Sequence, residues 1–80
     1  MSWVVSLKDD EGSYIDIEKK FNTFEEALEG INTILQFFEE KQKGQWTIEK
    51  ESDDPPGYTI ISNKNPLIRL NLMVFEVLEV

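Results

Sequence analysis

The sequence has no cysteine, no histidine and one arginine, Arg69, and these absences exclude several kinds of function. Without cysteine no disulfide forms, so the chain is not a disulfide-stapled secreted scaffold and its composition suits the cytosol. Nucleophilic catalysis is left with serine or threonine beside lysine. Ser6 and Lys8 offer that pair on one face of a strand, but strand neighbours of this kind are commonplace. We therefore expect a protein that is not an enzyme, with no catalytic residue.

Sequence motifs for cofactors and metals are also missing. There is no glycine-rich phosphate loop and no Gly-x-Ser-x-Gly elbow, so we expect no cofactor. Asp9, Asp10 and Glu11 stand before Gly12, superficially like a calcium loop. A calcium loop places its acids at alternate positions, whereas these are contiguous. We interpret the segment as a polar hairpin turn and expect no metal site.

Long hydrophobic runs are absent as well. No stretch approaches the roughly 20 apolar residues of a membrane span, and Arg69, Asn71 and Glu76 interrupt the C-terminal run. The first residues lack the basic start and apolar run of a signal peptide. We expect a soluble cytoplasmic protein, acting in the host cytoplasm if a phage encodes it.

Positive charge is scarce, since 8 basic residues face 16 acidic ones and the net charge is −8. Such a surface repels phosphate backbones and anionic lipid headgroups, so we expect no direct nucleic-acid or membrane binding. Opposite fields speed encounter and favour correct docking. The expected partner is a basic protein.

The residues that are present predict one globular domain over 1–80. Forty per cent of the chain is hydrophobic and 30% is charged, which is typical of a folded domain. A chain of this length has a thin core, and a net stability of roughly 3–5 kcal/mol is expected.

Alternating patterns predict the strands. Residues 3–8 and 14–18 alternate around a Gly-containing loop and predict a hairpin. Further strands are predicted over 46–50 and 58–62, separated by a segment, 52–57, whose two prolines are expected to interrupt the ladder. Residues 67–80 are strand-like but slip phase, which predicts a bulge near Met73–Val74. The alternative is that this tail leaves the domain and pairs with a second copy or a partner.

An amphipathic helix is predicted between these strands. Thr23 followed by Glu26 forms a capping box, and the apolar residues after it recur every three or four positions. Gly44 is placed to end the helix in a left-handed conformation. The order β-β-α-β-β-β predicts an α+β fold, a small two-layer sandwich with one helix packed on a mostly antiparallel sheet.

The helix carries two surface patches. Glu25, Glu29, Glu39 and Glu40 fall on one side over about 21 Å, at 1.5 Å per residue. This row is either a functional acidic face or an ordinary solvated one, and both interpretations stay open. Gly30, Thr33 and Phe37 form the second patch. There an off-stripe phenylalanine is a candidate interface anchor, the alternative being a widened core face.

Together these features predict a non-catalytic inhibitor that docks an acidic surface onto a basic partner, such as a nuclease or another nucleic-acid-handling complex. An immunity protein or a phage-encoded anti-defence protein that mimics nucleic acid is of this class, by analogy only. The alternative is a homo-oligomeric structural or adaptor module that assembles through residues 67–80. The predicted partner-binding residues are Asp9, Asp10, Glu11, Glu25, Glu29, Glu39, Glu40 and Phe37.

Overall fold

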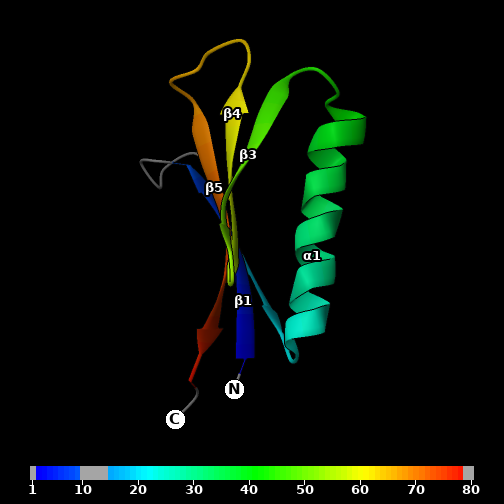
Figure 1. The fold of residues 1–80 in the computed structure, drawn as a ribbon, viewed down its shortest axis with the longest axis vertical. Helices are drawn as coiled ribbons and strands as arrows, with labels where there is room; N and C mark the ends of the chain where they lie inside the picture. Colours follow the sequence, from blue (N-terminus) through cyan, green and yellow to red (C-terminus); the bar gives the residue numbers. More distant parts are fainter. Residues whose placement is uncertain (1, 10–14, 79–80) are drawn as a thin grey trace.

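The computed structural model describes residues 2–9 and 15–78, which form one helical layer on one antiparallel sheet (Figure 1). Along the chain the elements are β1 (Ser2–Asp9), β2 (Asp16–Phe21), α1 (Phe24–Gln36), the π-helical turn η1 (Phe37–Lys41), β3 (Trp46–Asp53), β4 (Pro56–Ser62) and β5 (Arg69–Val77). The predicted α+β class and element order are confirmed.

The sheet order among the described strands is β2-β1-β5-β4-β3, and every neighbouring pair is antiparallel. The C-terminal strand β5 therefore lies in the middle of the sheet, between β1 and β4. Val5 and Leu7 of β1 lie opposite Val74 and Leu72 of β5, and all four are buried. Because residues opposite one another share a sheet face, these side chains form the core beneath the helix.

Helix α1 begins where the capping residue predicts. The backbone N–H of Glu26 donates to the Thr23 hydroxyl at 3.2 Å, which satisfies one of the donors left free at a helix start. Phe24 packs on Trp3 of β1, with ring centroids 4.7 Å apart. Ala27 and Ile31 on the same stripe are buried. The predicted apolar face is thus the face that packs on the sheet.

The end of the helix differs from a regular one. Residues Phe37–Lys41 form a wider π turn, and the N–H of Gln42 donates to the carbonyl of Phe37 at 3.3 Å. Phe38 remains in the core and meets Trp46 of β3 edge-on at 5.3 Å. Gly44 follows with φ of 79°, so the prediction of a left-handed glycine after the helix is confirmed.

The prediction of a bulge in the last strand is wrong. β5 pairs with β1 without interruption from Leu70 to Val77. The apparent phase slip arises because Leu70, Leu72 and Val74 face the helix, whereas Met73 and Phe75 face the other side of the sheet. Glu76 follows Val74 on the inner face, at the end of the sheet opposite Trp3, where it is exposed. No bulge is needed because polar residues are tolerated where burial stops.

The prediction that residues 52–57 interrupt the ladder is also wrong. Ser52 pairs with Gly57 and Asp53 with Pro56, so the β3–β4 hairpin continues into this segment after a register shift between Lys50 and Ser52. The Ser52 hydroxyl donates to the carbonyl of Pro55 at 2.7 Å and closes the turn. Proline fits here because Pro56 is the first residue of β4 and the ladder ends at this turn.

Candidate functional site

The acidic face of the helix is present as a row of exposed carboxylates. Glu25 and Glu29 lie on α1, and Glu39 and Glu40 on the π turn that continues it. Among the described residues, no lysine or arginine nitrogen lies within 4.0 Å of a carboxylate oxygen of these four residues. The row is therefore not neutralised within the described part of the chain.

The predicted loop acids are only partly covered by the structure. Asp9 ends β1, and its N–H donates to the carbonyl of Ile15 at 3.3 Å. Figure 1 shows β1 and α1 running in the same direction, so Asp9 lies toward the end of the molecule where Glu39 and Glu40 are found. Asp10 and Glu11 lie outside the described residues.

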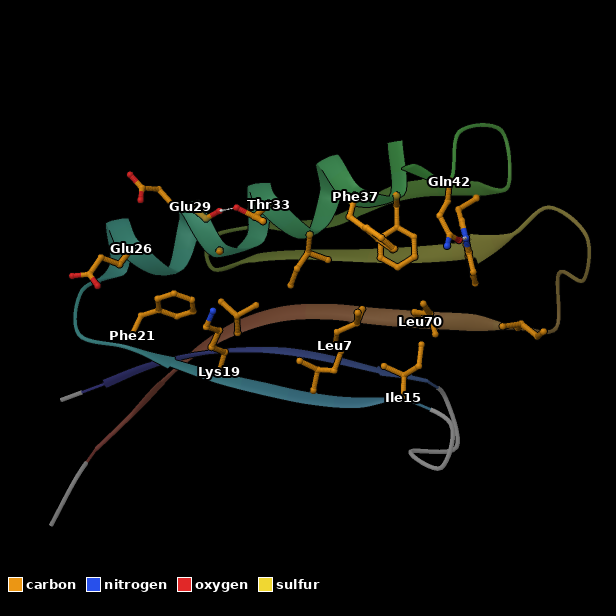
Figure 2. Close-up of a pocket in the computed structure, with 17 residues that line it drawn as sticks. Leu7, Ile15, Lys19, Phe21, Glu26, Glu29, Thr33, Phe37, Gln42 and Leu70 are labelled. Carbon is orange, nitrogen blue, oxygen red and sulfur yellow. Dashed lines mark hydrogen bonds between the residues drawn. The ribbon is translucent and has the colours of Figure 1, made fainter. Parts of the chain in front are cut away.

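A deep apolar groove runs between α1 and β2, and we call it the α1–β2 groove (Figure 2). It has a volume of about 790 Å³, within the usual range of binding pockets. Its floor includes the core residues Val5, Leu7 and Leu70. The groove therefore reaches down to the core between the two layers.

The walls of the groove come from the predicted second patch of the helix and from the inner face of β2. Gly30, Thr33 and Phe37 line it on the helix side. Ile17 of β2 is 50% exposed and Phe37 is 48% exposed, whereas Phe38, next to Phe37 in the chain, is buried. These two apolar side chains lie at the two edges of the groove, one on each wall.

Gly30 of α1 lies at one end of the groove, where tight packing against β2 explains why the residue is a glycine. A Cβ atom at Gly30 would lie 2.7 Å from the ring tip of Phe21. Gly30 therefore lets β2 approach the helix closely. At the other end, the Trp46 indole N–H donates to the Gln42 side-chain oxygen at 2.7 Å, so this polar pair is satisfied.

Charged residues stand at the rim of the groove. Glu26 and Glu29 line it from the helix, and Lys19 lines it from β2. The Lys19 ammonium lies 5.8 Å from the centroid of the Phe21 ring, a cation–π distance. Figure 2 shows both glutamates on the helix side of the groove, with the Glu29 carboxylate pointing away from the sheet, and the lysine on the β2 side. The rim is thus more acidic than basic.

The opposite face of the sheet is a mixture of apolar and paired polar groups. Met73 is 50% exposed and Phe75 39% exposed. Near them Lys8 forms ion pairs with Glu18 at 3.0 Å and Asp16 at 3.8 Å. The hydrogen bond and charge of Glu18, with a smaller effect of Asp16, raise the pKa of Lys8 above its ordinary value. Lys8 and its two acidic partners on this face are thus paired with one another.

The described part of the chain holds no cluster of metal-binding side chains. No group of three acidic side chains converges on one point among residues 2–9 and 15–78. No helix in these ranges is long and apolar enough to cross a membrane. The described structure presents a row of carboxylates beside an apolar groove.

Comparison of the chain with profiles of known protein families, with curated protein sequences and with solved structures gave no match.

Sequence reasoning identified half of this site. Gly30, Thr33 and Phe37 were noted as one off-stripe patch, and they form the helix wall of the groove. The contribution of β2 is not predicted: the alternation over 14–18 predicts that Ile15 and Ile17 are buried, whereas Ile17 is half-exposed, and the sequence assigns no role to Lys19. The only signal for Lys19 is its even spacing from Ile17 and Phe21, which places it on the inner face of the strand.

Proposed function

We propose that this protein is a non-catalytic inhibitor that docks the acidic face of its helix onto a basic protein. The observation that carries the proposal is the row of exposed glutamates without a cation partner among the described residues. Like charges four residues apart, such as Glu25 and Glu29, destabilise a helix slightly. A partner rich in lysine or arginine offsets that repulsion when it binds.

The class of partner follows from the spacing of the charge. Carboxylates spread over about 20 Å of helix fit a basic groove of comparable length, including one that normally holds nucleic acid. A nuclease or nucleic-acid-binding complex has such a groove, so an immunity protein or a phage-encoded anti-defence protein is the form of inhibitor we favour. We place its action in the cytoplasm, since the chain has no cysteine and gains nothing from an oxidising compartment.

The test is charge reversal on the helix with a matched control. The variant Glu25→Lys, Glu29→Lys, Glu39→Lys is compared with Glu49→Lys, Glu51→Lys, Glu76→Lys, which changes the net charge equally at exposed positions on the sheet. Both are used to capture partners from lysate of the native host at low and high salt, with identification by mass spectrometry.

We expect the unmodified protein and the sheet variant to retain a basic protein that the helix variant loses, and salt to weaken capture. Circular dichroism checks that both variants are folded. Retention by the helix variant, or equal loss in both variants, would contradict the proposal, because the position of the charge would then not matter.

A second candidate function is a homo-oligomeric module, and one observation favours it. β4 pairs with β5 only as far as Met73, so from Val74 to Val77 the described ladder pairs β5 with β1 alone. Phe75 and Leu78, exposed by 39% and 73%, lie at this open edge. Removing residues 67–80 would delete a central strand, so a point variant, Phe75→Lys, is the better test. Sedimentation should then show a dimer that this variant dissociates and that salt leaves unchanged.

A further inference from the structure

The width of the sheet shows that α1 covers only part of it. Five strands at about 4.8 Å spacing span about 19 Å between the outer two, whereas a helix with side chains is about 10 Å across. α1 contacts β1, β5 and β2, and touches β2 where Gly30 meets Phe21. Beyond that contact the groove separates the helix from β2. The inner face of the sheet therefore has room for further apolar groups beside α1.

The charges at the rim of the groove favour an occupant of one sign of charge. Glu26 and Glu29 line the groove together with Lys19. Glu40 and Lys41 line a shallow depression that shares Phe37 with the groove, so three carboxylates and two ammonium groups stand along this rim and its net charge is negative. From Glu26 to Glu40 is about 21 Å along a helix, or about four turns. A second copy of this chain carries the same negative charge, and an anionic lipid would also be repelled. The rim suits a basic occupant.

The edge of β2 argues against an extended occupant. Four of the six residues of β2 (Asp16–Phe21) are charged. Charged side chains on an edge strand are one way in which natural proteins avoid pairing with another chain. A helical occupant needs no backbone hydrogen bonds from this edge. Its apolar side chains enter the groove from a face that repeats every three or four residues.

We propose that the α1–β2 groove receives a basic amphipathic helix of the partner protein. Its apolar stripe packs on Ile17, Ile34 and Phe37. Its lysine or arginine flank reaches the carboxylates of Glu26, Glu29 and Glu40. This inference rests on the proposed function, and it adds the element of the basic partner that is recognised and the apolar contacts that supply affinity.

The proposal is tested with synthetic 18-residue peptides, so the natural partner is not needed. One peptide of leucine and lysine has the amphipathic helical period, a second has the same composition in scrambled order, and a third replaces lysine by glutamate. Affinity is measured by calorimetry at near-physiological salt. The binding site is mapped from the backbone amide resonances of the isotope-labelled full chain.

We expect the amphipathic leucine–lysine peptide to bind at least about tenfold more tightly than either of the others, a difference of about 1.4 kcal/mol. The perturbed amides should be those of β2 and of the groove side of α1. The variant Ile17→Ala, Phe37→Ala should weaken binding at least about tenfold, because both side chains are half-exposed at the edges of the groove. The control Met73→Ala is equally exposed but lies on the opposite sheet face, and it should change binding less than about twofold.

A second pair of variants covers the case in which the apolar variant does not fold. Glu26→Gln, Glu29→Gln removes two rim charges, and Glu49→Gln, Glu51→Gln removes two exposed charges of β3. The first should weaken the leucine–lysine peptide more than the second does. Equal binding of the scrambled peptide, resonance changes on the far sheet face, or self-association of the chain through the groove would each overturn the proposal.

The two proposals can fail separately. If charge reversal at Glu25, Glu29 and Glu39 abolishes capture of a basic protein but the peptides do not bind in the groove, the inhibitor function stands and the helical recognition is wrong. If the peptide binds in the groove but no basic protein is captured, the groove remains a helix-binding site and the proposed function fails.

Discussion

Leu72 and Met73 of β5 are adjacent residues on opposite faces of the sheet, and their truncation gives unequal losses of stability. Leu72 is fully buried between Leu7 and Tyr58, whereas Met73 is 50% exposed on the face away from the helix. Leu72→Ala removes three buried carbons, worth about 0.8 kcal/mol each in transfer free energy, and leaves a cavity. We expect a loss of about 3–4 kcal/mol.

Met73→Ala removes a side chain of similar size from a half-exposed position. About half of its surface is already in contact with water, and its removal leaves no closed cavity. We expect a loss of about 1 kcal/mol. Since a domain of this size has roughly 3–5 kcal/mol of net stability, the first variant should be close to unfolded in buffer and the second should remain folded.

The assay is urea unfolding followed by tryptophan fluorescence. Trp3 packs on Phe24 and Trp46 on Phe38, so both indoles report the loss of contact between helix and sheet. With an unfolding slope of about 1 kcal/mol per molar urea, the Met73→Ala midpoint should fall by about 1 M. A Met73→Ala variant as unstable as Leu72→Ala, or less stable, would show that the strand faces are assigned wrongly.

Three further outcomes follow from local geometry. Thr23→Ala should lower the free energy of unfolding by about 1 kcal/mol, because the Glu26 N–H loses its acceptor, while Thr23→Ser should keep most of that stability in the same urea assay. Gly44→Ala should cost about 1 kcal/mol in thermal or urea unfolding, since φ of 79° strains any residue with a Cβ although space around it is free; an unchanged midpoint would argue against this conformation. Asp53 should titrate below its ordinary value of 3.8, because the hydrogen bond and charge of Lys50 at 2.7 Å lower the pKa of its carboxyl. The stabilisation by this pair is present above 3.8 and is lost as the pH falls through the lower folded value, and carboxyl resonances of Lys50→Gln should show the pKa of Asp53 returning toward 3.8.

The local sequence was enough to predict the elements themselves. The spacing of Phe24, Ala27 and Ile31, with Thr23 before them, predicted the helix, its start and its buried face. Alternation predicted that Trp46, Ile48 and Lys50 share a face, and they lie opposite Ser62, Ile60 and Tyr58 on the inner side of the sheet. These features depend on contacts within one or two turns or on the two-residue period of a strand, so a short window of sequence contains them.

Boundaries and phases that depend on distant neighbours were predicted less well. The supposed bulge at Met73–Val74 came from expecting one apolar face to continue along the whole strand. In the structure the buried apolar part of the inner face ends at Val74, and Met73 and Phe75 lie on the other side of the sheet. The helix covers a strand face only between its own first and last residues. The alternation of apolar and polar residues along the strand does not predict where that cover ends.

The sequence by itself determined that this is an acidic, cysteine-free α+β domain with a carboxylate row along its helix, because charge and periodicity are properties of the chain. Only the tertiary structure placed β5 in the middle of the sheet, since strand order depends on hydrogen bonds between segments far apart in sequence. The existence of the α1–β2 groove was also decided only by the tertiary structure. Its position follows from the contact of Gly30 with Phe21 and from a helix too narrow to cover five strands.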